Sequence, residues 1–179
     1  MEKKNLFSPA AVLNLLLAAA AAVANAFVIV KSPDDDARFY ALVTMVALLA
    51  NLVYVVNGAG KEKARFYKAI AILFALSELT LVTDGLTKGG SVPFVAVDIV
   101  SLALILFLAL ARDLGKTRSL ALCGAVAVLK LVDAIFRAPV LWTAGDLGGL
   151  RSLVELALAL VFGFCTWLKY QDKARRGTK

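Results

Sequence analysis

Six long apolar runs occupy almost the whole of this 179-residue chain. Each run has about 20 residues, and a helix of that length, rising about 1.5 Å per residue, crosses the roughly 30 Å hydrocarbon core of a bilayer. Hydrophobic residues make up 61% of the chain, whereas a soluble domain would be about half apolar. The sequence therefore predicts an all-α integral membrane protein, with residues 1–179 forming a single six-helix transmembrane domain. The predicted spans are residues 10–30, 39–60, 67–86, 92–111, 119–138 and 150–169.

The segments between the runs are short, so we expect successive helices to lie antiparallel as three hairpins. Lys and Arg are divided unevenly between the two sides of such a bundle. Fourteen lie with the chain ends and the segments 61–66 and 112–118, and five lie with the segments 31–38, 87–91 and 139–149. Because basic segments stay in the cytoplasm, both the N- and the C-terminus are predicted to be cytoplasmic. This topology accounts for the net charge of +7 without a nucleic-acid partner. The expected environment is the lipid bilayer of a plasma membrane of bacterial type.

The first run is rich in small residues. Its segment Ala24-Asn25-Ala26 resembles a signal-peptide cleavage site, but the apolar run continues to Val30, so we expect a membrane span. Ala18, Ala22 and Ala26 are four residues apart and give a smooth helix face that another helix can approach closely. That face fits either packing within the bundle or a partner membrane subunit.

Eight ionisable side chains lie within the spans or at their rims. A charge at the bilayer centre costs on the order of 2.5–3.5 kcal/mol, so a chain that keeps eight of them is expected to use some. Distance along each helix places them from the midplane to the outer face, over an inner half that is almost purely apolar. We predict a ligand-binding set of Glu78, Asp98, Lys130, Asp133 and Glu155, and a secondary rim set of Asp84, Arg137, Arg151 and Trp142.

Spacing indicates how these charges pair. Lys130, Asp133 and Arg137 follow one another at i, i+3 and i+7, which places them on one helix face. Side chains at i and i+4 also share a face, and side chains at equal depth on neighbouring helices can meet. The predicted pairs are Asp133 with Arg137, Arg151 with Glu155, and Glu78 with Lys130.

The eight charges do not balance. Five are acidic and three are basic, which leaves an excess of two carboxylates when all are ionised. One interpretation is a paired polar network that fixes helix register, with the rim residues snorkelling to water. The other is a polar cavity that opens to the outside and suits a cationic or zwitterionic ligand, a metal cation or protons. Trp142, expected in the last outer loop, anchors the chain at the interface or caps such a site.

Several chemistries are excluded. The chain has no histidine, so histidine-based haem, zinc and nucleophilic sites are ruled out. Cys123 and Cys165 are expected to act as small apolar packing residues, and no glycine-rich phosphate loop is found. We therefore predict no cofactor, no metal site and no catalytic residue. An intramembrane aspartyl enzyme would need a pair among Asp84, Asp98 and Asp133, and their spacing does not favour one.

In length, in its six spans and in the alanine spacing of its first run, the chain is similar to the substrate-capture subunits of energy-coupling-factor importers. The resemblance is one of size and layout and carries no residue across. It implies a small membrane subunit that binds a solute on the outer side and relies on partners for energy.

The expected function is that of a small polytopic membrane protein that binds a cationic or zwitterionic solute, or an ion, and helps to transport it through a polar site in the outer half of the bundle. Two alternatives stay open. A non-catalytic scaffold or accessory subunit of a larger membrane complex is indicated by the short loops and the absence of catalytic motifs. A membrane enzyme would need its carboxylates grouped around a substrate-sized groove.

Overall fold

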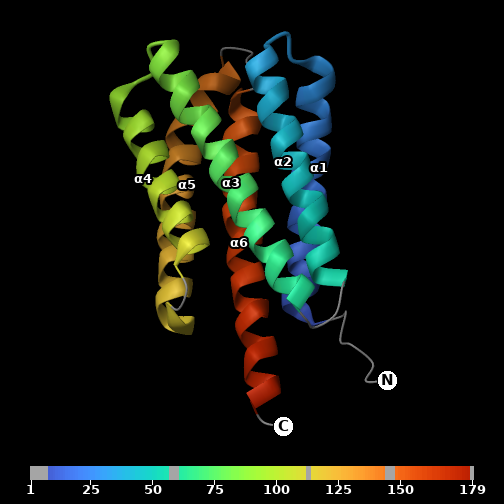
Figure 1. Cartoon of the computed structure of the whole chain (residues 1–179). Helices are drawn as coiled ribbons and strands as arrows, with labels where there is room; N and C mark the ends of the chain where they lie inside the picture. Colours follow the sequence, from blue (N-terminus) through green and yellow to red (C-terminus); the bar gives the residue numbers. More distant parts are fainter. Residues whose placement is uncertain (1–7, 57–60, 112–113, 144–147, 178–179) are drawn as a thin grey trace.

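The structure, a computed structural model, is all-helical in the residues that it describes, which are 8–56, 61–111, 114–143 and 148–177. Side chains are described for residues 8–56, 63–111, 114–137 and 150–171. Each of the six helices is long and apolar enough to cross a membrane, which confirms the predicted all-α membrane class. The helices are α1 (Pro9–Lys31), α2 (Asp35–Val56), α3 (Lys61–Thr87), α4 (Val92–Leu110), α5 (Gly115–Thr143) and α6 (Gly148–Gly177) (Figure 1).

Most of the helices extend beyond the apolar runs. Helix α3 begins at Lys61 rather than at residue 67, and α6 continues to Gly177 rather than ending at residue 169. Lys, Arg, Glu and Ala are good helix formers, so the backbone stays helical where the hydropathy has already fallen. The placement of Trp142 in a loop was also wrong, because α5 continues through Pro139 to Thr143. The side chain of Trp142 lies outside the described residues.

Helix α6 occupies the middle of the bundle. It contacts α1, α2, α3 and α5, whereas α4 contacts only its chain neighbours α3 and α5. The chain runs up and down the view in Figure 1, with the segments 32–34 and 88–91 at the upper end. We call this the loop end. The opposite end, where α3 begins at Lys61 and α6 continues past Lys169, is called the basic end.

Aromatic rings fill the core between these ends. Phe162 of α6 stacks on Tyr67 with the ring centroids 5.4 Å apart, and Phe74 meets it edge-on at 6.0 Å. Tyr54 of α2 lies 6.3 Å from Tyr67. Phe74 and Phe162 are fully buried. The rings therefore join α2, α3 and α6 through close packing, which stabilises helix association where lipid removes the hydrophobic driving force.

The inner half of the bundle is not almost purely apolar, and that prediction was wrong. Asn51 donates a hydrogen bond to the Asn14 carbonyl oxygen at 2.8 Å, and Asn14 donates to the backbone oxygen of Val161 at 3.0 Å. The Cys165 thiol donates to Asn51 at 2.9 Å, and Cys123 lies 3.3 Å from the Thr166 hydroxyl. Both thiols are buried as expected, but they also form hydrogen bonds. Single amides, thiols and hydroxyls scarcely lower the mean hydropathy of a 20-residue run. This hydrogen-bond network therefore cannot be recognised from the hydropathy of the runs.

The three alanines of α1 do not share one environment. Ala18 lies in the bundle core, Ala22 is half-buried and Ala26 is exposed. Ala18 therefore supports packing within the bundle, and a partner subunit at this face stays a prediction.

Replacement of Phe162 with Ala tests the aromatic core. Phe162→Ala should lower the free energy of unfolding by about 3 kcal/mol, because it removes a buried ring from the contact between α3 and α6. Thermal or SDS-induced unfolding of the purified protein measures the change. Phe107→Ala is the matched control, since Phe107 is 52% exposed on the lipid-facing side of α4. Equal stability of the two variants would contradict this account of the core.

Candidate functional site

A single lysine joins four helices near the middle of the bundle. Lys130 of α5 places its Nζ atom 2.6 Å from Glu78 Oε2 of α3, 2.8 Å from Asp98 Oδ1 of α4 and 3.2 Å from Glu155 Oε2 of α6. None of these four side chains is more than 2% exposed. The predicted pair of Glu78 and Lys130 is confirmed. The structure adds Asp98 and Glu155 to it, so one ammonium serves three carboxylates.

Arg137 forms a second bridge one step closer to the loop end. Its Nη2 atom lies 3.0 Å from Asp133 Oδ1 and 3.2 Å from Asp98 Oδ2. The predicted pair of Asp133 and Arg137 is confirmed. Asp98 uses one oxygen for Lys130 and the other for Arg137. It therefore connects the two cations.

Arg151 does not pair with Glu155, and that prediction was wrong. The Nη1 atom of Arg151 lies 3.1 Å from Asp84 Oδ2 of α3. Glu155 turns instead toward the deeper Lys130. A spacing of i and i+4 brings two side chains to one face but does not decide which neighbour each one chooses. The two possible partners of Arg151 lie at different depths in the bundle, and Asp84 is the one nearer the loop end.

Three charged residues at the loop end were missed by the sequence reasoning. Lys88 Nζ lies 2.8 Å from Asp84, 2.9 Å from Asp34 and 3.3 Å from Asp36. Its hydrogen bonds to Asp84 and Asp34 raise the pKa of Lys88, and the hydrogen bond from Lys88 lowers the pKa of Asp34. Both groups therefore stay charged over a wider pH range than usual. The sequence did contain a signal for this contact. The acidic run at residues 34–36 and Lys88 lie in two segments that were predicted to be on the same side of the membrane.

These contacts define two groups of charges. The buried cluster comprises Glu78, Asp98, Lys130, Asp133, Arg137 and Glu155, and the rim cluster comprises Asp34, Asp36, Asp84, Lys88 and Arg151. The buried cluster has four carboxylates and two cations, so its net charge is −2 when all are ionised. The predicted excess of two carboxylates thus lies entirely in the deepest part of the site.

Several buried polar atoms lack a hydrogen-bond partner among the described residues. Glu78 Oε1, Glu155 Oε1 and Asp133 Oδ2 accept no hydrogen bond, and the Tyr40 hydroxyl and Ser101 Oγ have no partner. Ser101 lies one turn below Asp98 on the same face of α4. Leaving such a group unsatisfied costs about 1–3 kcal/mol. The buried cluster therefore has both charge and hydrogen-bonding capacity for a further positive group.

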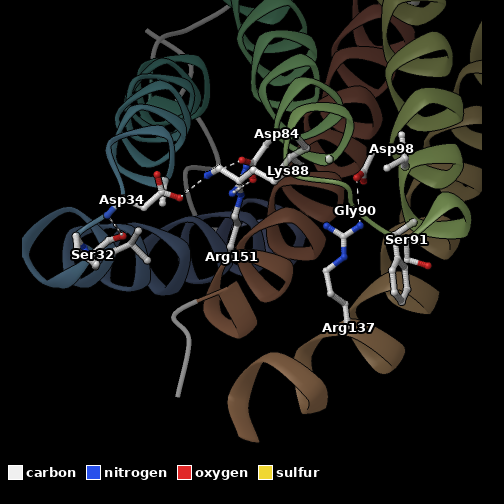
Figure 2. Close-up of a pocket in the computed structure, with 16 residues that line it drawn as sticks. Ser32, Asp34, Asp84, Lys88, Gly90, Ser91, Asp98, Arg137 and Arg151 are labelled. Carbon is white, nitrogen blue, oxygen red and sulfur yellow. Dashed lines mark hydrogen bonds and ion pairs between the residues drawn. The ribbon is translucent and has the colours of Figure 1, made fainter. Parts of the chain in front are cut away.

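A cavity of about 490 Å³ leads from the loop end to the buried cluster (Figure 2). Asp98 and Arg137 line it and also belong to the buried cluster. Apolar side chains from four helices complete its wall. They are Val28 of α1, Ala37 of α2, Leu81 of α3, and Phe94 and Val95 of α4.

Glycine at position 85 allows α3 and α4 to approach closely beside the cavity. A Cβ atom added to Gly85 would lie 2.7 Å from Val95 Cγ2, which is too close for two carbon atoms. The cavity wall thus depends on a residue without a side chain at this point.

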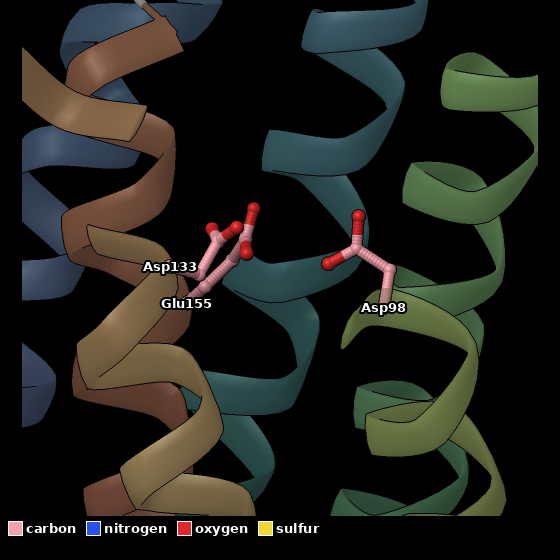
Figure 3. A group of neighbouring side chains, drawn as sticks. All are labelled: Asp98, Asp133 and Glu155. Carbon is pink, nitrogen blue, oxygen red and sulfur yellow. The ribbon is translucent and has the colours of Figure 1, made fainter. Parts of the chain in front are cut away.

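Three carboxylates of the buried cluster come close enough to share a cation. Oxygen atoms of Asp98, Asp133 and Glu155 lie within 4.8 Å of one another (Figure 3). Lys130 already contacts Asp98 and Glu155, and Arg137 already contacts Asp98 and Asp133. The protein's own cations therefore bridge the trio, so that no bound metal is needed to hold it together. Arg137 also stands between Asp98 and Asp133, an arrangement unlike two catalytic aspartates that share a proton.

A second cavity lies on the lipid-facing side of α1, α5 and α6. It has a volume of about 560 Å³, and its wall is neutral, with Leu13, Ala127 and Phe164 among its residues. A hydrocarbon surface of this kind suits lipid chains or an apolar helix and offers nothing to a charged solute.

Comparison of the chain with protein-family models, with curated proteins and with solved structures finds no match.

Replacement of Lys130 tests the central ion pairs. Lys130→Met should lower the free energy of unfolding by on the order of 3–5 kcal/mol, because it leaves Glu78 and Glu155 buried without a cation, while Asp98 keeps Arg137. Neutralising two of those carboxylates in the same chain, as Glu78→Gln and Glu155→Gln, should restore part of the loss. Thermal unfolding in detergent measures both effects.

The control for Lys130→Met is Lys88→Met. Lys88 also contacts three carboxylates but is 50% exposed, so its loss should change stability by about 1 kcal/mol or less. If the two variants unfold alike, the buried cluster does not have the role assigned to it.

Proposed function

We propose that this chain is a membrane protein that binds a small cationic or zwitterionic solute, or an ion, and helps to transport it. The loop-end cavity admits the solute and the buried cluster holds it. The observation that carries this proposal is that four buried carboxylates share only two cations at the base of a cavity that opens at the loop end.

The charge excess supports a positively charged or zwitterionic ligand. Burying an ionised carboxylate without a partner is costly in a low-dielectric interior, and the cost falls when a positive group joins it. A bound cation, an ammonium group or a proton would each reduce the net charge of −2 in the buried cluster. A simple anion would increase it.

The distribution of basic residues supports a membrane orientation with the loop end outside and both termini in the cytoplasm. In the sequence, fourteen Lys and Arg residues are predicted to lie with the chain ends and the segments 61–66 and 112–118, and five with the segments 31–38, 87–91 and 139–149. In this orientation the six helices form three antiparallel hairpins, and the cavity faces the exterior of a bacterial-type plasma membrane.

The buried polar groups on the cytoplasmic side support transport rather than binding alone. The network around Asn14, Asn51 and Thr166 continues the polar interior toward the basic end. The rings of Phe74 and Phe162 lie between this network and the buried cluster along α3 and α6. A solute released from the cluster toward the cytoplasm would pass these rings.

Neutralising the buried carboxylates tests the proposal. Glu78→Gln and Asp133→Asn should each abolish solute-dependent stabilisation and uptake, because each removes one of the negative charges that the ligand would balance. The measurements are thermal unfolding and uptake into proteoliposomes with sodium, potassium, primary amines and apolar α-amino acids as probes. The control is Asp35→Asn, since the side chain of Asp35 is 93% exposed and its ion pair among the described residues is with Arg38. Unchanged binding and uptake in both buried variants would refute a role for the cluster.

A further inference from the structure

Two arginines line the loop-end cavity from adjacent helices. Arg137 of α5 and Arg151 of α6 both line it, and Figure 2 shows Arg137 extending toward Asp98 and Arg151 toward Asp84. Each guanidinium lies over an aromatic ring, with Arg137 Cζ 4.9 Å from the centre of Phe94 and Arg151 Cζ 4.6 Å from the centre of Tyr40. Stacking on a ring holds a guanidinium in one orientation and adds cation–π attraction. The cavity therefore presents two oriented forks rather than two mobile charges.

Both guanidinium groups have N–H donors that make no hydrogen bond to the described residues. A guanidinium has five N–H donors, and Arg151 uses its Nη1 atom for Asp84. Its Nε and Nη2 atoms, together with Nε of Arg137, are buried without an acceptor among the described residues. A carboxylate bound beside the two guanidiniums would supply acceptors for these donors. Carboxylate is also the anion whose two oxygens match the guanidinium fork.

The charges of the cavity wall alternate in sign. Asp34, Asp84 and Asp98 face three cations. Lys88 lies 2.9 Å from Asp34 and 2.8 Å from Asp84, Arg151 lies 3.1 Å from Asp84, and Arg137 lies 3.2 Å from Asp98. A ligand with one charge would meet a like charge at every position. A ligand that carries both charges on neighbouring atoms would meet a guanidinium with one and the adjacent carboxylate with the other.

Most of the other side chains on the cavity wall are apolar, and the polar exceptions are Ser32 and Ser91. Val28, Leu81 and Val95 lie on its wall, and the volume of about 490 Å³ falls within the usual range for small-molecule sites, about 300–1,000 Å³. An apolar side chain on the ligand would pack against this surface.

We infer that the loop-end cavity binds an apolar α-amino acid as a zwitterion, with its carboxylate between Arg137 and Arg151 and its ammonium against Asp84 and Asp98. The inference rests on the proposed function, because it names the class of solute for the same cavity. An α-amino acid carries its ammonium and its carboxylate on the same carbon atom, which keeps the two charges as close together as the alternating wall requires. The net charge of the buried cluster disfavours a simple carboxylate, and the two guanidiniums disfavour a simple amine.

Matched sets of three ligands test this inference. Phenylalanine is compared with phenethylamine, which lacks the carboxylate, and with hydrocinnamate, which lacks the ammonium. Leucine is compared in the same way with isoamylamine and isocaproate. Binding to the protein in lipid nanodiscs is measured by calorimetry and by the shift in unfolding temperature. At least one amino acid should bind, with both of its single-charge analogues weaker by about tenfold or more.

Variants at the arginines separate recognition from folding. Arg151→Lys keeps the positive charge beside Asp84, which also retains Lys88, but loses the fork and the planar stack on Tyr40. It should weaken amino-acid binding by about tenfold while leaving the unfolding temperature of the ligand-free protein nearly unchanged. Arg38→Lys is the control, because Arg38 contacts the exposed Asp35 and does not line the cavity.

The possible outcomes distinguish this inference from the proposed function. If an amine or an inorganic cation binds as tightly as either amino acid, or if neither amino acid binds while a cation does, the inference is wrong and the proposed function stands. Equal binding of an amino acid and its acid analogue, or no effect of Arg151→Lys, also overturns the inference. If no amino acid, amine, sodium or potassium ion binds, the proposed function fails with it.

Discussion

The ion pairs of Lys130 hold the interior of this bundle together. One ammonium contacts Glu78, Asp98 and Glu155, so α3, α4, α5 and α6 converge on a single positive charge. In the hydrocarbon core, no water solvates that ammonium group or the carboxylates that it contacts. The four helices must therefore keep the relative depth and rotation at which the contacts form. Asp98 also pairs with Arg137, which lies nearer the loop end. Both residues line the cavity, so the buried cluster forms part of the cavity wall.

The same arrangement stabilises the fold and prepares a site. When all four carboxylates are ionised, one lysine and one arginine cannot neutralise them, so the cluster holds the helices together while keeping a deficit of positive charge. The deficit lies below a cavity whose own wall alternates in sign from Asp34 to Arg137. An ammonium group on the solute would supply the missing positive charge near the buried carboxylates. A carboxylate on the same solute would accept hydrogen bonds from the two arginines. The proposed function follows from these two requirements acting together.

Depth and spacing were enough to predict part of this site from the sequence. They predicted the ion pairs of Glu78 with Lys130 and of Asp133 with Arg137, because depth in the membrane and helix face both follow from the regular geometry of a helix. They did not bring Arg151 to Asp84, since the choice between two acceptors depends on how α3 and α6 rotate against each other. The hydrogen bond of Asn14 to Val161 was missed for a related reason. An amide inside an apolar run shows that it needs a partner but not which helix supplies one.

The most direct test of the account asks whether the cavity beside the buried cluster is open to the exterior. Val95→Cys places a thiol in the cavity wall, one turn from Asp98, without adding bulk. Membrane-impermeant thiol reagents of opposite charge are applied to each face of oriented membranes. The parent chain, whose Cys123 and Cys165 are buried, serves as the blank. The account predicts reaction from the loop-end face alone, faster with the cationic reagent. No reaction from that face, or equal reaction from both faces, would contradict it.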